Sequence, residues 1–323
     1  MKVFFVAFLC CLPLKAQEIF KQKTHLMGCN FEITVVAKNQ AQANNYINLA
    51  IAEITRIEKL ISSWDPTSET SKINKNAGGK PVVVSDELIQ LVIRAKNISK
   101  ITDGAFDVSY ASMDKVWFFN GSMQKMPSAE AIKNSVKNID FQNIIIDETN
   151  HTIFLKNKGM KIGFGAIGKG YAADKAKQLL VKNGISAGII NASGDMNAWG
   201  KQPNGKAWQV AVTNPLNKNK AFAFFPIENS AVVTSGNYEK FVVFDNKRYS
   251  HIIDPRTGYP TTELASCTVF APKAELADAL ATSVFVMGTK IGLHFINQLP
   301  DIECILVNNS GTVFYSDNIK KEP

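Results

Sequence analysis

Residues 250–260 have the sequence Ser250-His251-Ile252-Ile253-Asp254-Pro255-Arg256-Thr257-Gly258-Tyr259-Pro260. This stretch combines a histidine, a carboxylate, an arginine and a hydroxyl with a backbone that prolines and a glycine restrict. Pro255 favours an extended Asp254, and Thr257-Gly258 favours a turn, so we predict a rigid loop that leaves a strand. Rigid polar loops are common binding and catalytic sites. The alternative is that Asp-Pro-Arg-Thr-Gly is only a well-formed turn.

The N-terminus differs in character from the rest of the chain. The 323 residues, 46% of them hydrophobic and 20% charged, have an ordinary globular composition. Residues 1–16 are predicted to be an export signal, because Lys2 precedes a short apolar run and Ala16 precedes a suitable cleavage point. The run is too short to cross a membrane. Cys10 and Cys11 leave a lipoprotein anchor open as an alternative to a soluble exported form.

Charge and cysteines exclude several classes of protein. Removal of Lys2 and Lys15 lowers the formal charge from +8 to +6, and the surplus is spread along the chain without a dense basic block. Nucleic-acid binding is therefore not expected. The remaining cysteines, Cys29, Cys267 and Cys304, are odd in number and lack a CxxC spacing. They predict neither a disulfide framework nor a thiolate metal site.

The periodicity of the chain predicts hairpins and helices rather than a series of βαβ units. Apolar spacing predicts helices, with Ser85 as an N-cap, and β-branched runs predict strands. The helices are expected at 41–61, 85–101, 171–182 and 274–287, and the strands at 31–36, 143–146, 152–155, 187–191, 208–213, 221–226, 231–234, 240–244, 249–253 and 267–271.

A glycine-rich segment lies between a predicted strand and a predicted helix. Gly163, Gly165 and Gly168 satisfy G-x-G-x-x-G, and Asp195 follows 27 residues after Gly168 (195 − 168). This is the pattern of a dinucleotide fold and of a nicotinamide-dependent oxidoreductase. The mid-chain position and the flanking hairpins argue against that fold. A phosphate-bearing ligand near residues 163–170 remains the prediction, because glycines allow close approach and a helix N-terminus offers N–H groups.

The predicted helix at 274–287 carries a carboxylate and a hydroxyl on one face. Asp278 and Thr282 are four residues apart, and the residues around them are small. A solvated helix position would explain the aspartate. A site for a hard cation is the alternative, since Mg²⁺ takes one or two carboxylates, a hydroxyl or carbonyl and substrate phosphates.

Together these segments resemble the FAD:protein FMN transferase family, the ApbE-type proteins formerly called thiamine-biosynthesis lipoproteins. The resemblance covers nearly the whole mature chain in one order, which generic folding constraints do not produce. The matching segments are Met27-Gly28, Ser62-Ser63-Trp64, Ser68-Glu69, Asn74, residues 102–107 (Thr-Asp-Gly-Ala-Phe-Asp), residues 165–174 (Gly-Ala-Ile-Gly-Lys-Gly-Tyr-Ala-Ala-Asp), Ser235-Gly236-Asn237-Tyr238, His251–Gly258 and Asp278–Thr282.

The resemblance implies an exported α+β enzyme with a two-lobed fold of mixed and antiparallel sheets flanked by helices. It implies that residues 17–323 form a single domain, located in the periplasm as a soluble or lipid-anchored protein. Members of this family move the FMN half of FAD onto a threonine or serine hydroxyl of a partner protein and release AMP. Typical acceptors are flavin-carrying subunits of membrane redox complexes such as the sodium-translocating NADH:quinone oxidoreductase. The chemistry is Mg²⁺-dependent phosphoryl transfer.

The resemblance also assigns roles to residues. Asp278, Thr282 and the backbone carbonyl of Ala166 are implied as the Mg²⁺ ligands, which makes Asp278 catalytic through the metal. His251 is the candidate general base; the alternative is a histidine that only bonds a phosphate oxygen. The positions implied to contact FAD are Met27, Trp64, Ala105, Phe106, Asp107, Lys169, His251 and Ile253.

Two departures from the family pattern affect the expected affinity and flavin pose. Ser193-Gly194 replaces the glycine pair usual before Asp195, and Gly163 stands where some members carry an aspartate. Neither departure removes an implied metal ligand or His251. The rival functions are a Mg²⁺-dependent FAD pyrophosphatase that produces FMN and AMP, and a non-catalytic flavin-binding protein.

Overall fold

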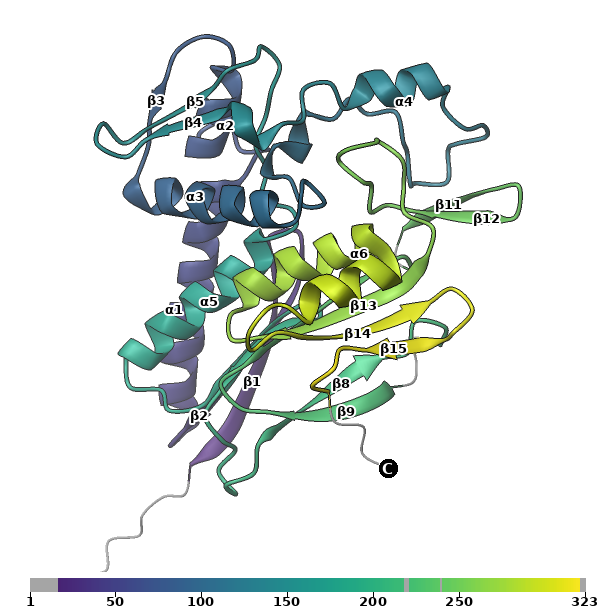
Figure 1. Cartoon of the computed structure of the whole chain (residues 1–323). Coiled ribbons are helices and arrows are strands. Elements are labelled where there is room, and N and C mark those ends of the chain that lie inside the picture. The colour runs from purple at the N-terminus through teal and green to yellow at the C-terminus, as the bar shows by residue number, and fades with distance from the viewer. Residues whose placement is uncertain (1–16, 218–220, 239, 320–323) are drawn as a thin grey trace, which may run out of the picture.

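The computed structural model of the chain describes residues 17–217, 221–238 and 240–319, so the predicted export signal lies outside the described residues. Its largest element is an eight-stranded sheet in the order β1-β2-β6-β7-β10-β13-β14-β15 (Figure 1). The strands are β1 (Glu18–Leu26), β2 (Cys29–Ala37), β6 (Gly188–Ala192), β7 (Asp195–Trp199), β10 (Ala231–Gly236), β13 (Leu264–Ala271), β14 (Glu303–Asn308) and β15 (Val313–Tyr315). Neighbouring strands in this described sheet pair antiparallel throughout. The α+β class is confirmed, and the dinucleotide fold, which needs parallel strands, is excluded.

Helices and a hairpin cover the two faces of this sheet. On one face lie α1 (Gln40–Ile61), α5 (Gly168–Lys182) and α6 (Ala274–Ile296). On the other face, the hairpin of β8 (Trp208–Thr213) and β9 (Ala221–Ile227) packs Trp208 and Val210 against Val36 and Val232. Val35 and Val233, the neighbours of those two valines, belong to the core on the helical face. This alternation along β2 and β10 builds a core on each side of the sheet.

Smaller elements extend the molecule beyond the helical face (Figure 1). A three-stranded sheet, in the order β3-β5-β4, adjoins α2, and Lys96 on α3 donates to the Ile144 carbonyl of β4. A separate hairpin of β11 and β12 projects from the body near α4 (Figure 1). The bounds are α2 (Glu69–Lys75), β3 (Val82–Val83), α3 (Asp86–Ile101), α4 (Ala129–Ser135), β4 (Ile144–Asp147), β5 (Thr152–Leu155), β11 (Phe241–Phe244) and β12 (Lys247–Ser250).

The four predicted helices are present, and the bounds of two of them differ from the prediction by more than one residue. α5 begins at Gly168 rather than at residue 171, because Gly168 and Gly170 are packing positions inside the helix and not parts of a turn. A Cβ at Gly170 would lie 2.1 Å from the carbonyl oxygen of Ala274. α6 continues past residue 287 to Ile296, through a kink at Gly288, whose φ of 77° suits glycine. α6 is long and apolar enough to cross a membrane, but half of that segment is buried inside the protein.

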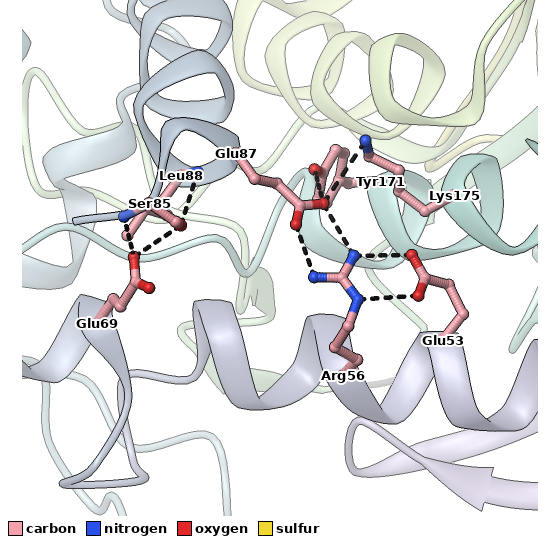
Figure 2. Close-up of polar contacts among 8 residues, drawn as sticks. All are labelled: Glu53, Arg56, Glu69, Ser85, Glu87, Leu88, Tyr171 and Lys175. Atoms are coloured by element: carbon pink, nitrogen blue, oxygen red, sulfur yellow. Dashed lines mark hydrogen bonds and ion pairs between the residues drawn. The ribbon is translucent and has the colours of Figure 1, made fainter. Parts of the chain in front are cut away.

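An ion-pair network fixes α5 against α1 and α3 (Figure 2). Arg56 on α1 donates to Glu53 at 2.7 Å and to Glu87 on α3 at 2.6 Å. The Tyr171 hydroxyl on α5 donates to the same Glu87 carboxylate at 2.7 Å, and the Lys175 ammonium lies 3.5 Å from it. Three helices therefore meet at one carboxylate. The network holds the helix whose first turn carries the glycine-rich segment.

Candidate active site

A cavity of about 1470 Å³ is lined by the first turn of α5, one face of α6, strands β1, β2, β6, β7 and β10, and several loops. Its size suits a ligand as large as a dinucleotide. The loops that reach it include residues 63–64, 105–111, 163–166 and 251–255. The glycine-rich segment and the His251 loop, which are far apart in the sequence, thus line the same cavity.

The glycine-rich segment forms one wall. Gly165, Ala166 and Lys169 line the cavity, and α5 begins within this segment at Gly168. Ile167 caps the helix without a side-chain hydrogen bond. The Gly170 amide donates instead to an Asp278 carboxylate oxygen at 3.1 Å. Amide N–H groups at a helix N-terminus favour a negatively charged ligand. This agrees with the phosphate-bearing ligand that the sequence predicts near residues 163–170.

Lys169, Asp195 and Asp278 form a buried charge cluster beside that wall. The Lys169 ammonium pairs with Asp195, whose side chain is 3% exposed. Burial opposes the charge on Lys169, but Asp195 and Asp278 outweigh it and raise the pKa of Lys169. Burial and the nearby Asp195 carboxylate raise the pKa of Asp278 to about 7. The Lys169 ammonium thus faces two carboxylates. It can exchange its contact with one of them for a contact with a phosphate of a ligand.

Asp278, Thr282 and Ala166 supply oxygen donors to the same cavity. The hydroxyl of Thr282 lies 3.3 Å from that of Ser235 on β10. Within the described residues no cluster of three or more His, Cys, Asp or Glu side chains is present. A carboxylate, a hydroxyl and a backbone carbonyl are nevertheless hard donors, and they fit Mg²⁺ completed by substrate phosphates.

His251 directly follows β12 and lies half-buried in the cavity wall. Its Nδ1 atom lies 3.1 Å from the Lys240 carbonyl oxygen, which also accepts the His251 backbone N–H at 3.0 Å. Because a carbonyl only accepts, Nδ1 carries the hydrogen and the lone pair of the neutral ring is on Nε2. The ring edge meets Phe119, with centroids 6.5 Å apart. The Lys240 carbonyl and the Phe119 ring therefore orient the imidazole.

The rest of the loop is structural. Asp254 accepts two hydrogen bonds from the Arg256 side chain, each at 2.9 Å, and one from the Arg256 backbone. Gly258 has a φ of 76°, and a Cβ there would meet the Ile132 carbonyl oxygen at 2.9 Å. Both interpretations of the stretch thus apply to different parts of it: His251, Ile253 and Pro255 line the cavity, and Asp254–Gly258 form a tight turn.

Most of the predicted FAD-contacting residues lie together. Ala105, Phe106, Asp107, Lys169, His251 and Ile253 all line the cavity, as does Trp64. Ala105 and Phe106 are buried, whereas Trp64 is 93% exposed at the mouth of the cavity. An exposed indole beside a large cavity is suited to stack on a flat ring.

Two of these predicted residues have other contacts. Met27 is not among the lining residues; it lies in the turn between β1 and β2, with its terminal methyl on the side of Gly168. Asp107 lines the cavity, but its carboxylate accepts hydrogen bonds from the Ser109 amide and hydroxyl and from the Phe141 amide. Its main role is to shape the loop that presents Phe106.

Sequence reasoning missed several lining residues. Asp195 fits the sequence pattern only as the acid of the excluded dinucleotide fold; in the structure it begins β7 and carries the partner carboxylate of Lys169. Tyr110 follows the Ala105–Asp107 motif by one turn and also faces the cavity. Burial raises the pKa of its phenol to about 12. The spacing from residue 106 to residue 110 was the signal that could have identified it.

The two departures from the family pattern have local explanations. Ser193 adopts a φ of 54° and donates its hydroxyl to the Asn30 carbonyl at 3.1 Å, so a serine is accommodated in this turn. At Gly163 a Cβ would lie 2.9 Å from the Ala111 side chain. A larger residue at 163 would require residue 111 to move.

Comparison with known proteins gives consistent results. The model of the ApbE family matches residues 27–306. The chain is 31% identical to a FAD:protein FMN transferase of Klebsiella pneumoniae (strain 342), over 93% of this chain and 92% of that protein. It is also 31% identical to the FAD:protein FMN transferase of Treponema pallidum (strain Nichols), over 87% of this chain and 82% of that protein.

Solved structures show the same fold. The ApbE protein of Thermotoga maritima superposes with a TM-score of 0.84 at 29% identity, over 93% of this chain and 97% of that one. The Pseudomonas stutzeri flavinyl transferase ApbE superposes with a TM-score of 0.83 at 24% identity, over 95% of this chain and 97% of that one. The second likeness is one of fold alone.

Proposed function

The chain belongs to the ApbE family, and we propose that it is a Mg²⁺-dependent FAD:protein FMN transferase that acts in the periplasm. One observation carries the proposal: a single cavity is lined by His251, by Lys169 at the start of α5, and by the hard donors Asp278 and Thr282. Phosphoryl transfer needs a base, charge neutralisation on the phosphates and fixed positions for both. The names of the relatives, FAD:protein FMN transferases, support the same reaction.

In the proposed reaction, a threonine or serine oxygen of the acceptor protein attacks the phosphorus atom of the FMN half of FAD. A phosphoester bond forms between that phosphorus and the acceptor oxygen. The bond from the same phosphorus to the bridging pyrophosphate oxygen breaks, and AMP leaves with that oxygen. The flavin keeps its redox state, so the step needs no oxidant or reductant.

His251 is the proposed acceptor of the hydroxyl proton. The Lys240 carbonyl holds the Nδ1–H tautomer, so the Nε2 lone pair is the one that takes the proton. A neutral imidazole is suited to this task near neutral pH. Without a base at this point, the acceptor hydroxyl would have to attack while it retained its proton.

The opposite wall of the cavity is proposed to bind the pyrophosphate. The Lys169 ammonium would contact phosphate oxygens beside the first turn of α5. Asp278, Thr282 and the Ala166 carbonyl would hold Mg²⁺, which when bound neutralises charge on the pyrophosphate. Phe106 and Trp64 would pack against the flat rings of FAD.

We propose flavin-carrying subunits of membrane redox complexes as the acceptors, of the sodium-translocating NADH:quinone oxidoreductase type. The predicted export signal in residues 1–16 and the protein acceptor in the names of the relatives support this class. Membrane association, through a lipid on Cys10 or Cys11 or through the acceptor complex, follows from the same proposal.

The proposal is tested by mass spectrometry of such a flavin-carrying subunit after incubation with this protein, FAD and Mg²⁺. The expected result is a mass gain of one FMN on the subunit, accompanied by AMP and lost when EDTA is added. AMP and free FMN without a modified subunit would assign the protein to the FAD pyrophosphatases instead. FAD binding without either product would leave only a flavin-binding role.

A further inference from the structure

An aromatic surface borders the cavity next to His251. We call it the aromatic rim and define it as the loop of residues 113–127 together with the side of the β11–β12 hairpin that faces this loop. The register pairs Val242 with Tyr249 and Phe244 with Lys247, so these side chains share one face of the hairpin. Val242, Phe244 and Tyr249 pack in one cluster with Trp117 and other loop residues.

Aromatic contacts and one hydrogen bond fix the loop on the hairpin. The Trp117 ring stacks with Tyr249 and with Phe119, at centroid distances of 6.1 and 6.4 Å. Its indole N–H donates to the Gly258 carbonyl at 2.9 Å. The inner layer of the rim is therefore packed and hydrogen-bonded, and it supports the side chains that lie outside it.

The rim continues directly to the proposed base. The His251 backbone N–H donates to the Lys240 carbonyl, which extends the β11–β12 pairing by one residue pair. His251 therefore lies on the same side of the hairpin as Tyr249, and Phe119 from the loop meets its ring edge. A polypeptide that delivers a hydroxyl to His251 would pass over this rim.

The outer side of the rim is apolar and basic. Phe118 and Met126 are exposed to 38% and 37%, and the Lys115 ammonium lies 5.2 Å from the centre of the Phe118 ring. The exposed charged residues of the rim, among those that the structure describes, are Lys115, Lys125, Lys247 and Asp114, with Asp245 in the hairpin turn; Lys240, at the border, also lines the cavity. The cations outnumber the carboxylates, which favours a partner with acidic side chains.

We propose that the aromatic rim is the docking surface for the acceptor polypeptide, a segment with apolar and acidic side chains around its target threonine or serine. The inference rests on the proposed transferase function, because that reaction requires a second, protein substrate beside His251. Aromatic side chains and methionine are enriched in protein interfaces, and Phe118 and Met126 supply both kinds here. FAD has its own cavity, so the rim belongs to the other substrate.

The test compares Phe118→Asp and Lys115→Glu with the wild-type protein and with Phe224→Asp as the matched control. Phe224 is 66% exposed on β9, in the hairpin that covers the other face of the large sheet. The readouts are KM and kcat for a flavin-carrying subunit, FAD affinity by flavin fluorescence, and AMP release without an acceptor. None of the substituted side chains lines the FAD cavity or packs in a core.

We expect Phe118→Asp to raise KM for the subunit at least tenfold and to leave FAD affinity and acceptor-free AMP release unchanged. Phe224→Asp should behave as the wild type. Two threonine peptides test the charge argument: the wild type should prefer a peptide with aspartates around the threonine over one with lysines, and Lys115→Glu should reduce this preference at least tenfold.

An unchanged KM in Phe118→Asp, while the wild type modifies the subunit, would overturn the docking proposal and leave the transferase function intact. The docking proposal would fall equally if the variant only abolished a dimer in size-exclusion chromatography or binding to vesicles of anionic phospholipid. Failure of the wild type to place FMN on any subunit would overturn both proposals together.

Discussion

A Cβ atom at Gly170 would lie 2.1 Å from the carbonyl oxygen of Ala274 and 2.8 Å from the Glu275 amide. The first turn of α5 thus rests directly on the first turn of α6. This contact brings the Gly170 amide within 3.1 Å of the Asp278 carboxylate. The proposed phosphate wall and the proposed metal ligand are therefore aligned by one glycine.

Gly170→Ala should destabilise the protein by about 2–3 kcal/mol, because the backbone of Ala274 cannot move away as a flexible side chain could. We expect a lower urea midpoint and, at temperatures where the variant folds, weaker FAD binding. Gly165→Ala is the control for stability, since a Cβ there would meet no atom within 4 Å. Equal urea midpoints for Gly170→Ala and the wild type would show that the two helices can separate without cost.

Glu87 should make folding stability depend on pH (Figure 2). The hydrogen bonds from Arg56, and then that from Tyr171, overcome burial and lower the pKa of Glu87 from 4.5 to about 2. A carboxyl whose pKa falls on folding stabilises the folded state above its unfolded value and loses this contribution as the pH drops toward its folded value. Because Arg56 is half-exposed, solvent weakens this interaction. We therefore expect ionised Glu87 to add only about 1–2 kcal/mol to the free energy of unfolding, less than the full pKa shift would give.

The measurement is urea denaturation of the wild type and Glu87→Gln between pH 7 and pH 2.5. The variant should be less stable at pH 7, and the difference should shrink below about pH 4.5. Glu148→Gln, at an exposed residue with one long hydrogen bond of 3.4 Å from Gln90, is the control. A difference that stayed constant down to pH 2.5 would rule out the charged form of Glu87 as its source.

The sequence predicted the elements with strong periodicity. α1 has a polar N-cap, Asn39, and buried isoleucines at helical spacing. The pattern failed where tertiary contacts decide: Gly168 and Gly170 have the composition of a turn, but they lie in the helix, where Ile61 of α1 packs against Gly168 and the start of α6 packs against Gly170. β14 was missed although four of its six residues are buried, since a short apolar run near the end of the chain has no periodicity of its own.

In the candidate site too, the sequence predicted residues that belong to a local motif and missed those placed by tertiary contacts. His251 and Asp278 were predicted from motif and spacing, and both line the cavity. Asp195 was not assigned, because its partner Lys169 is 26 residues away in the sequence and meets it only through the β6–β7 hairpin. A local pattern cannot report a contact that the order of the strands creates.

Asp278→Ala should abolish Mg²⁺-dependent AMP release, because it removes the only carboxylate among the proposed metal ligands. We expect a fall of at least 100-fold, on the scale of the loss of one charge-stabilising group. Thr282→Ser, which keeps a hydroxyl, is the control and should retain most of the activity. Normal AMP release by Asp278→Ala at ordinary Mg²⁺ concentrations would remove Asp278 from the metal site.

His251→Ala should keep FAD affinity and lower the rate of FMN transfer about 10²- to 10⁴-fold, the usual contribution of a general base. The residual rate should rise with pH, since only hydroxide then removes the acceptor proton, and added imidazole should restore part of the activity. His294→Ala, at an exposed residue near the end of α6, is the matched control. If His251 only bonded a phosphate oxygen, the variant would instead bind FAD more weakly, and its pH profile would keep the shape of the wild type.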